Sequence, residues 1–500
     1  MDPELEINIQ ETRRQFFGRS LATVGSTLGL AALSGLEGSP LLGGDVPSAD
    51  LTSLGRAGSL LQPHHPPKIK RVISLFMSGA PSQMDLFDHK PKMNDLFDKD
   101  LPESIIDGQR LTTMTSGQAR FPVAPSRFEF DRYGPSGAEI SELLPHTAGI
   151  ADRITIIKSM FTEAINHDPA MTFMQTGSQQ PGRPSLGSWL NYGLGSMNSS
   201  LPAFMVMQAT WTGRRSAQAL FERLWGAGML PSEYQGVSLR SIGDPVLYLS
   251  DPPGVERTTR RQMLDSLARL NGKVVDAIGD PETVARIAQY EMAYRMQTSV
   301  PDVMDISKES KKTLEAYGAQ VGGASLGNNC LLARRLAEKG VRFVQLFDWG
   351  WDYHGTNPKE DIRDGLTKKC ATMDKPISAL INDLKERGLF DETLIIIGGE
   401  FGRTPFREGR TSKGKVLGRD HFPDCYTMVM AGGGVKGGHV HGESDELGFS
   451  VAKDPVHVHD LQATWMHLLG FDHEQLTYRF QGRDYRLTDV HGHVVKDLLA

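Results

Sequence analysis

The sequence predicts an α/β fold with a mostly parallel central sheet and helices on both of its faces. The first observation is a set of six short apolar runs, each with the length of a buried strand: residues 72–77, 153–159, 202–208, 341–347, 392–400 and 426–434. The second is a set of segments with helical spacing of apolar residues between and after these runs: 141–152, 329–340, 373–388 and 458–470. Strands that alternate with helices favour a parallel sheet covered on both faces.

The composition is that of a globular protein without an excess of basic residues. The chain has 500 residues, of which 39% are hydrophobic, and this is enough to bury a full core. Its formal net charge of -6 argues against a surface that neutralises a phosphate backbone, so no nucleic acid partner is expected. The three cysteines lie far apart and form no CxxC pair. This excludes a zinc knuckle and a dense disulfide framework but leaves one disulfide open.

Residues 1–44 have the features of a twin-arginine export signal. Arg13 and Arg14 precede two aromatic residues and then an apolar run, rich in glycine and alanine, from Leu21 to Leu36. This run is short and rich in small residues, which disfavours the alternative, a membrane anchor. The pattern predicts export of the folded chain by the twin-arginine translocation machinery, and hence a periplasmic or secreted protein.

Residues 45–68 are predicted to form a linker, because they are rich in Ser, Pro, Gly and Leu and have no sustained period. The α/β domain then extends over residues 69–500. In parallel sheets the chemistry gathers at the carboxyl ends of the strands. We therefore expect residues 78–88, 348–357 and 400–403, which follow three of the strands, to lie at one rim.

Residues 251–325 are predicted to form a helical insertion or cap on this domain. Apolar residues follow helical spacing from 257 to 278, and a second helical stretch occupies 281–300. No strand signal separates the two stretches. This segment is where determinants of substrate selectivity are expected.

Five blocks of the sequence, taken in order, resemble a family of exported bacterial proteins that is called domain of unknown function 1501 and labelled sulfatase-like. The blocks are SGAPSQMDLFDHKP, HDPAMTFMQTGSQQPGRPSLGSWLNYGLG, LARRLAEKGVRFVQLFDWGWDYHGTN, GGEFGRTP and GRDHFPDCYTMVMAGGGVKGG. The resemblance covers nearly the whole chain after the linker. It implies a fold similar to that of the alkaline phosphatase superfamily, in which one or two metal ions activate a hydroxyl-type nucleophile.

Glu400 is the first candidate metal ligand under this resemblance. It matches the carboxylate of a superfamily metal pair, whereas Phe401 stands where that pair has a histidine. A site that lacks one ligand binds a metal more weakly or binds a single ion. The alternative is that Glu400 forms a structural salt bridge with Arg403.

Asp352 and His354 are the second candidate pair. They lie two residues apart on a glycine-flanked loop just after a strand, and a carboxylate with an imidazole suits zinc, manganese or iron. His421 resembles the late histidine that completes the superfamily site, with Asp420 as the group that would hold it. The alternatives are a surface hydrogen bond for the first pair and a plain loop position for His421.

Asp85 follows the first strand, where superfamily members carry a metal-binding aspartate. Ser82 or Asp88 could occupy that position instead, and either acid could cap the next turn. The candidates together would hold one or two divalent ions, and zinc, manganese, iron and calcium all stay open.

His167 stands where the sulfatases of this superfamily have their nucleophile. Those enzymes carry a Cys-x-Pro-Ser-Arg loop followed by a helix that ends in Thr-Gly, and HDPAMTFMQTG matches its length, its proline and its end. No cysteine of this chain lies in such a loop, so formylglycine-dependent hydrolysis is not expected. Three roles stay open for His167: a nucleophile that attacks phosphorus, a metal ligand or acid/base beside the metal, and a structural cap of the helix. Asn166 and Arg183 are candidate contacts for the developing negative charge.

These patterns together favour an exported metal-dependent hydrolase of phosphate or sulfate esters. The predicted site comprises Asp85, His167, Asp352, His354, Glu400 and His421. Arg183 or Arg403 would contact the anionic group of the ester, and esters carried on a polysaccharide are among the candidates. The alternative is a secreted binding or scaffold protein that keeps the fold without turnover, which the changes at Phe401 and His167 would explain. The oligomeric state stays open.

Overall fold

The computed structural model describes residues 62–500 except for 107, 109–110, 114, 210–219, 241–244, 247–250, 252–253, 280 and 410–415. The predicted signal region 1–44, and the linker 45–68 as far as residue 61, lie outside the described residues. Within the described part of the chain, no helix is long and apolar enough to cross a membrane.

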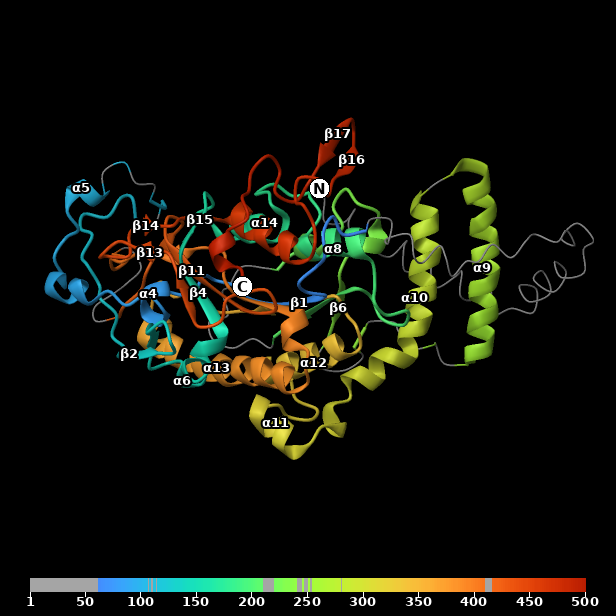
Figure 1. The fold of residues 1–500 in the computed structure, drawn as a ribbon, viewed down its shortest axis with the longest axis horizontal. Helices are drawn as coiled ribbons and strands as arrows, with labels where there is room; N and C mark the ends of the chain where they lie inside the picture. Colours follow the sequence, from blue (N-terminus) through green and yellow to red (C-terminus); the bar gives the residue numbers. More distant parts are fainter. Residues whose placement is uncertain are drawn as a thin grey trace, which may run out of the picture. The chain divides into compact units, whose positions relative to one another are not determined.

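A nine-stranded sheet lies at the centre of the fold (Figure 1). From edge to edge its strands are β12 (His439–His441), β4 (Ile154–Phe161), β11 (Tyr426–Gly432), β8 (Thr393–Gly398), β1 (Arg71–Met77), β7 (Phe343–Asp348), β5 (Phe204–Gln208) and β6 (Val237–Leu239), while β15 (Val456–His457) pairs with β4. All pairings in this sheet are parallel except the two that β11 makes with β4 and β8. The predicted α/β fold with a mostly parallel sheet is confirmed.

Each of the six apolar runs forms a strand of this sheet. The short edge strands β6, β12 and β15 were not predicted, because two or three residues carry no measurable period. β11 is antiparallel to both of its neighbours because of the connection that leads to it from β8. The described chain between β8 and β11 contains no crossover helix, and the short strands β9 (Gly402–Arg403) and β10 (His421–Phe422) pair there in antiparallel fashion instead.

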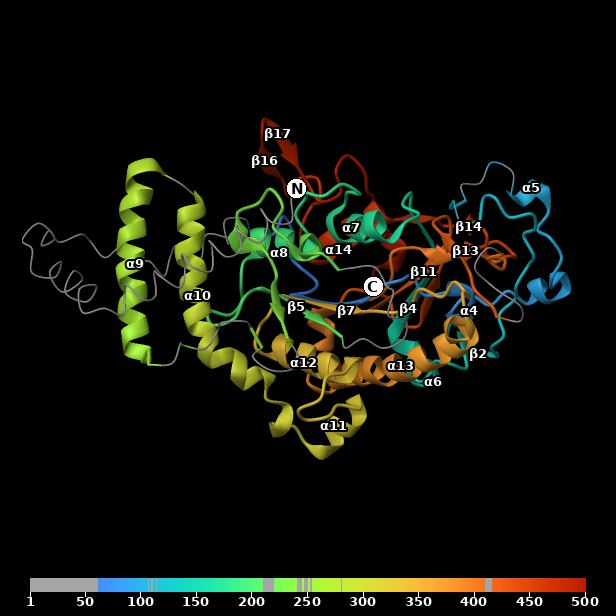
Figure 2. The same ribbon diagram turned by 180° about the vertical axis from the view of Figure 1, so that it is seen from behind.

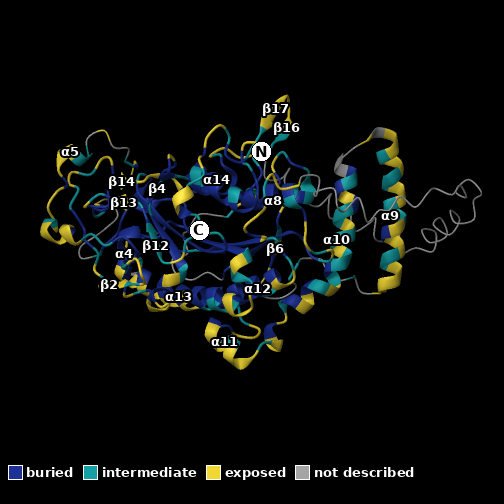
Figure 3. Cartoon of the chain, in the orientation of Figure 1, coloured by how far each residue is buried: buried dark blue, intermediate teal, exposed yellow. Residues whose placement is uncertain are grey.

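Helices cover both faces of the sheet (Figures 1 and 2). One face packs against α6 (Pro145–Ala148), α12 (Leu326–Glu338) and α13 (Ile362–Glu386), and the other against α7 (His167–Thr176), α8 (Leu186–Leu194) and α14 (Val458–Leu468). Along β1, Ile73 and Leu75 belong to the first apolar layer, and Val72 and Phe76 belong to the second. Every residue of β1 is therefore buried (Figure 3), which explains its continuous apolar run.

The two longest helical stretches predicted for 251–325 form α9 (Arg257–Ile278) and α10 (Pro281–Met304), which pack against each other. Arg261 donates a hydrogen bond to Glu291 at 3.0 Å, and the Arg257 guanidinium lies 4.6 Å from the ring centre of Tyr294. α10 also contacts α12. The division of the chain into a body and an insertion stays a prediction.

The other elements are short. They are the helices α4 (Gln83–Leu86), α5 (Glu103–Ile106) and α11 (Lys311–Tyr317), and three antiparallel strand pairs: β2 (Phe130–Tyr133) with β3 (Ala138–Ser141), β13 (Glu443–Ser444) with β14 (Val451–Lys453), and β16 (Tyr478–Phe480) with β17 (Arg483–Tyr485).

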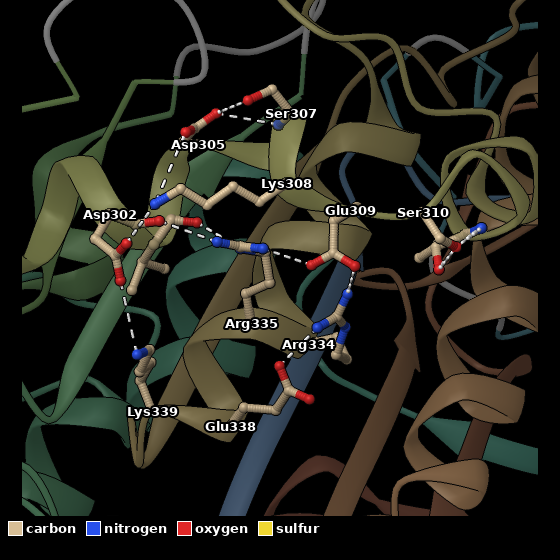
Figure 4. A network of polar contacts seen from close by, with 12 residues as sticks. Asp302, Asp305, Ser307, Lys308, Glu309, Ser310, Arg334, Arg335, Glu338 and Lys339 are labelled. Carbon is tan, nitrogen blue, oxygen red and sulfur yellow. Dashed lines mark hydrogen bonds and ion pairs between the residues drawn. The ribbon is translucent and has the colours of Figure 1, made fainter.

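A buried ion-pair network joins the chain after α10 to α12 (Figure 4). Glu309 lies 2.8 Å from a guanidinium nitrogen of Arg334 and also pairs with Arg335. Arg334 is 2% exposed and pairs further with Glu338 and Asp383. Burial alone would lower the pKa of Arg334, but Glu309 and Glu338 raise it above its ordinary value. The charge is kept in this buried position because carboxylates surround it.

Replacement of Glu309 is expected to destabilise the protein. Glu309→Ala leaves two arginines with one carboxylate fewer, and the expected loss is about 3 kcal/mol in the free energy of unfolding, measured by equilibrium urea unfolding. Lys311→Ala is the matched control, because its pair with Glu315 joins side chains that are 91% and 66% exposed. Its expected loss is below about 0.5 kcal/mol. Equal losses in the two variants would contradict the role given to the network.

Candidate metal centre

Four side chains that can bind a metal converge at the carboxyl edge of the sheet. Asp352 and His354 lie on the loop after β7, His421 begins β10, and His167 is the first residue of α7, the helix after β4. One ligand atom from each lies within 4.8 Å of the other three, and all four side chains are buried. The sheet thus assembles one cluster from three segments that are far apart in the sequence.

The carboxylate oxygen Oδ1 of Asp352 is the centre of this cluster. The Nε2 atom of His354 lies 2.7 Å from it, that of His167 lies at 3.4 Å, and that of His421 lies at 3.5 Å. Three imidazoles therefore present the same ring nitrogen to one carboxylate oxygen.

Each histidine is held by a hydrogen bond at its other ring nitrogen. Nδ1 of His167 lies 2.6 Å from Oε1 of Glu400, and Nδ1 of His354 lies 2.5 Å from Oε2 of Glu408. Nδ1 of His421 lies 3.0 Å from the carbonyl oxygen of Ile165. Since carboxylate and carbonyl oxygens only accept, Nδ1 carries the hydrogen in all three rings. In the neutral form of each imidazole, the lone pair of Nε2 is therefore directed to the interior of the cluster, which is the arrangement of metal-binding histidines.

Two of these nitrogens lie near Asp352 at 3.4 and 3.5 Å but are not hydrogen-bonded to it. Nε2 of His167 and Nε2 of His421 are buried and make no hydrogen bond with any residue that the structure describes. Buried polar atoms are nearly always satisfied, because an unmade hydrogen bond costs about 1–3 kcal/mol. Two such atoms beside a buried carboxylate fit a bound cation.

The donor set also narrows the kind of ion. Three imidazole nitrogens and one carboxylate oxygen suit zinc, iron or manganese. Calcium takes six to eight oxygen ligands in proteins. The nitrogen-rich set therefore favours a transition metal over the calcium that the sequence left open.

The electrostatics of the cluster favour the ligand forms of two members. Burial raises the pKa of Asp352, but Arg403 and the three histidines hold it well below its ordinary value. Burial and the neighbouring His167 hold the pKa of His421 well below its ordinary range. At neutral pH Asp352 is thus ionised and His421 is neutral.

The other two histidines behave differently. Burial alone would lower the pKa of His354, but the hydrogen bonds to Asp352 and Glu408 raise it to about 9. The pKa of His167 is raised in the same way, against burial, by Asp352 and Glu400. A cation that takes their Nε2 lone pairs would displace protons, so binding to this cluster would release protons to solvent.

Arg403 holds Asp352 from the other side. Its guanidinium donates to Asp352 Oδ1 at 2.5 Å and to the backbone carbonyls of Gly79, Ala80 and Arg419. The salt bridge considered between Arg403 and Glu400 is replaced by this arrangement, because Glu400 accepts from His167 instead. A contact between Arg403 and an anionic substrate group stays a prediction.

Gly79 allows the loop after β1 to approach the Asp352 loop. Its φ is +107°, and a Cβ atom here would lie 2.7 Å from the backbone nitrogen of Asp352. Its N–H donates to Glu400 Oε1 at 3.0 Å. A side chain at this position would push the two loops apart and disturb both Asp352 and Glu400.

Two predicted ligands lie outside the four-residue cluster. Glu400 stands behind His167, and Asp85 is paired with Arg419 at 2.9 Å and accepts from Ser82 at 2.6 Å. Asp85 is fully buried, so its charge is balanced by the arginine. In this structure both carboxylates support neighbouring side chains, and their binding to a metal stays a prediction.

Phe401 and Asp420 both contact the cluster indirectly. The Phe401 ring centre lies 5.1 Å from that of His167 and 4.8 Å from that of His421, so it packs against two of the imidazoles. Asp420, predicted to hold His421, accepts from its backbone N–H at 2.8 Å rather than from its ring. His354, Glu408 and Asp420 form a second group of buried residues with closely spaced ligand atoms.

Arg183 has other partners. Its guanidinium lies 3.5 Å from Asp489 and stacks 4.4 Å from the ring centre of Tyr485. No contact joins it to the His167 cluster within the described residues, and its predicted role toward an anionic group stays untested. Asn166 occupies the N-cap position of α7 directly before His167, its side chain makes no capping hydrogen bond there, and its predicted contact with the developing charge stays a prediction.

Neither Glu408 nor the Ile165 carbonyl could be predicted from the sequence. Glu408 lies in the segment PFREGR, which matches no metal-binding spacing, and a backbone carbonyl leaves no trace in a sequence. The only available signal for Glu408 was its place in the loop that follows the GGEFGRTP block.

The fold and the cluster define an α/β protein with a candidate metal centre at the carboxyl edge of its sheet. The chain belongs to the family described as "Protein of unknown function (DUF1501)", whose model matches residues 69–499. The family predicted from the five blocks is confirmed.

One curated relative matches part of the chain. Lipoteichoic acid synthase 2 from Bacillus subtilis (strain 168) is 26% identical over 170 residues, which are 31% of this chain and 24% of the relative. The match thus spans about a quarter of the relative's length.

Solved structures with some similarity include members of the alkaline phosphatase and sulfatase group. A protein in the alkaline phosphatase superfamily from Vibrio parahaemolyticus is 9% identical, covers 84% of this chain and 75% of its own, and has a TM-score of 0.35. The PsFucS1 sulfatase from Pseudoalteromonas sp. is 12% identical, with coverages of 86% and 73% and a TM-score of 0.32. Scores this low carry no statement about the activity of this chain.

Metal content tests the cluster directly. The purified wild-type protein is expected to retain about one equivalent of a transition metal by elemental analysis, and His167→Ala and His421→Ala are expected to lose most of it, because each removes one of four ligands. His493→Ala is the matched control, since His493 is exposed and outside the cluster. Wild-type protein without metal, or unchanged content in both ligand variants, would contradict the assignment.

A second test of the cluster measures metal affinity after a change at Glu408, whose carboxylate contacts Nδ1 of His354. Glu408→Gln keeps the shape of the side chain but removes the charge that holds the hydrogen on Nδ1. The expected effect is about 10- to 100-fold weaker metal affinity in a competition titration, with the metal still bound at saturation. Unchanged affinity would show that Glu408 does not support His354.

Proposed function

We propose that this chain is an exported metal-dependent hydrolase of phosphate or sulfate esters. The observation that carries the proposal is the convergence of three Nε2 atoms on the Asp352 carboxylate, with two of these nitrogens unsatisfied among the described residues. A divalent ion held there would polarise an ester oxygen and lower the pKa of an attacking water. The five sequence blocks resemble the family that the chain belongs to, and the fold that this resemblance implies, similar to that of the alkaline phosphatase superfamily, supports the choice of ester chemistry.

The residues of the chain prepare the site for this chemistry. Glu400 and Glu408 keep the hydrogen on Nδ1 of two histidines, and Arg403 orients the Asp352 carboxylate. The four clustered residues are only 4–7% exposed, so little bulk water reaches them. Charges in such a site interact more strongly than in water, which favours the stabilisation of developing negative charge.

His167 is assigned as a metal ligand in this proposal. Its Nδ1 is bound by Glu400 and its Nε2 faces Asp352, as expected of a ligand and in the same manner as His354. The N-cap position of α7 is occupied by the preceding residue, Asn166, and both ring nitrogens of His167 face carboxylates rather than the backbone of the helix. Direct attack by His167 on phosphorus would require Nε2 to leave the cluster.

Formylglycine chemistry is not part of the proposal. Cys330, Cys370 and Cys425 are buried and unpaired, and burial raises the pKa of each thiol. None of them belongs to the four-residue cluster. The disulfide that the sequence left open is not formed.

Export is the part of the proposal that rests on the N-terminal residues. Arg13 and Arg14, followed by the apolar run to Leu36, support transport by the twin-arginine route to the periplasm or beyond. Arg13→Lys with Arg14→Lys is expected to leave the protein in the cytoplasm of a bacterial host, as measured by cell fractionation. Equal periplasmic amounts of the variant and the wild type would contradict this route.

Hydrolysis is tested with metal-loaded protein and a panel of aryl phosphate monoesters, phosphate diesters and sulfate esters. Turnover of at least one phosphate ester is expected, with loss on chelation and recovery when the metal is restored. Asp352→Asn is expected to lower kcat/KM by about 100-fold or more, because it removes the charged ligand. His493→Ala is expected to match the wild type.

The binding-protein alternative predicts a different result. Protein that holds a full equivalent of metal in the cluster and hydrolyses no ester of the panel would contradict the hydrolase proposal. The same protein would then be expected to bind inorganic phosphate or sulfate in the presence of the metal and to release it unchanged. Isothermal titration of metal-loaded protein with these anions distinguishes the two cases.

A further inference from the structure

The two residues that flank Asp352 face a helix rather than the candidate metal centre. Trp351 and Tyr353 are buried and lie against α13, the long helix that packs on one face of the sheet (Figure 1). Asp352 and His354 face the cluster instead. The side chains of residues 351–354 thus alternate between α13 and the cluster, as they do in an extended chain. A rotation of this segment would turn both ligands away from the cluster.

Tyr353 is held by a close contact with Gly365 of α13. Its hydroxyl donates a hydrogen bond to the carbonyl oxygen of Gly365 at 3.1 Å. A Cβ atom at Gly365 would lie 2.1 Å from Cε1 of the tyrosine ring, so a larger residue would force the ring away from the helix. Glycine lowers the stability of a helix relative to alanine, and the approach of this ring accounts for its presence here.

Trp351 is held by a buried ion pair. Asp348, the last residue of β7, accepts from Nε1 of Trp351 at 3.0 Å through one carboxylate oxygen. Its other oxygen accepts from Nζ of Lys369, on α13, at 2.7 Å. The Lys369 ammonium also lies 5.6 Å from the centre of the Trp351 ring. All three residues are at most 3% exposed, so the Asp348 carboxylate joins the helix to the residue before Asp352 inside the core.

The two contacts come from one side of α13. Gly365 and Lys369 are four positions apart, so they lie one above the other on the same face of the helix. A buried ion pair adds little stability over apolar side chains of the same size, because both charges lose their hydration. The orientation that the pair imposes on Trp351 is therefore the better explanation for a buried lysine at this position.

Backbone hydrogen bonds extend this orientation to the neighbouring loop. The N–H of Ser78 donates to the carbonyl oxygen of Asp348 at 2.8 Å, and the N–H of Trp351 donates to the carbonyl oxygen of Ser78 at 3.3 Å. The next residue, Gly79, donates to Glu400 Oε1 at 3.0 Å. The loop after β7 is thus joined to the loop after β1 at the tryptophan that the ion pair holds.

We propose that Lys369 is a positioning residue of the candidate metal centre. It holds Asp348, which in turn holds Trp351. The fixed tryptophan keeps the next residue, Asp352, and with it His354, directed into the cluster. This proposal rests on the metal centre of the proposed function and adds no ligand to it. Loss of the ammonium would leave all four ligands in the chain but would free the segment that carries two of them to turn.

Hydrogen exchange of the metal-free, full-length chain tests the order of this segment. Lys369→Met keeps the apolar stem and removes the ammonium. Because this change leaves Asp348 without its cation, Trp351→Phe provides a second, uncharged change that removes only the Nε1 donor and part of the ring. In both variants the amides of residues 349–354 are expected to exchange about 10-fold or more faster than in the wild type, while those of β1 and β8 keep their rates.

Trp189→Phe is the matched control for the tryptophan variant. Trp189 is 1% exposed on α8, and its Nε1 makes no hydrogen bond with any residue in the described part of the chain. Its replacement changes the packing of the core to a similar degree but breaks no contact with the loop after β7. Exchange of residues 349–354 is expected to match the wild type in this variant.

A competition titration measures the consequence for metal binding. With zinc as the probe, Lys369→Met and Trp351→Phe are expected to bind about 10-fold more weakly than the wild type, since the ligands remain but their geometry is no longer fixed. The visible absorption of cobalt-loaded protein is expected to change in both, because these bands report the arrangement of the ligands. A role confined to packing would leave both readouts at their wild-type values, as expected for Trp189→Phe.

The outcomes separate this proposal from the proposed function. Wild-type exchange of residues 349–354 in both variants would overturn the proposal whatever the metal content. Faster exchange together with wild-type zinc affinity would also overturn it, because the ion pair would then order the loop without positioning the ligands. Wild-type protein that binds no zinc would overturn the metal centre and this proposal together, which is a different result from the first two.

Discussion

The buried carboxylate of Asp352 is the constraint on which the candidate centre depends. A buried negative charge is stable only where cations and hydrogen-bond donors surround it. Arg403 supplies a fixed positive charge, and three histidines complete the surroundings. Since the guanidinium of Arg403 also binds carbonyls after β1 and before β10, the same contact that orients Asp352 fixes the loops around it. The geometry of the candidate metal centre and the conformation of the surrounding loops therefore depend on the same side chain, Arg403.

The parallel sheet explains why such an arrangement forms at this edge. β1, β7 and β8 are neighbours, so the loops that follow them meet at their carboxyl ends. Gly79 permits the closest approach between two of these loops, and Phe401 fills the space beside two imidazoles where the superfamily resemblance led us to expect a histidine. The antiparallel β11 and the short β9 and β10 bring His421 back to the same place. His167, the first residue of α7, then supplies the imidazole that lies next to the Phe401 ring.

Much of the fold could be predicted because its signals are local. Buried parallel strands appear as continuous apolar runs, and α9 has the same bounds as its predicted period. Four candidate ligands that the structure brings together also follow strand ends or begin a helix, where chemistry is expected. The sequence could not distinguish residues of the four-residue cluster from carboxylates that support neighbouring side chains. Glu400 and Asp85 follow strands just as the clustered Asp352 does, but Glu400 contacts His167 and Asp85 pairs with Arg419. Glu408 comes from a loop without a motif, and only its contact with His354 reveals it.

The central claim is that three imidazoles and one carboxylate bind a single transition metal. X-ray absorption spectroscopy of the metal-loaded protein measures this most directly, because multiple scattering from imidazole rings counts the histidines around the ion. The account predicts three histidines and at least one oxygen ligand, with the histidine count falling to two in His421→Ala. A shell of oxygen atoms alone, or sulfur in the first coordination sphere, would place the metal elsewhere and contradict the account.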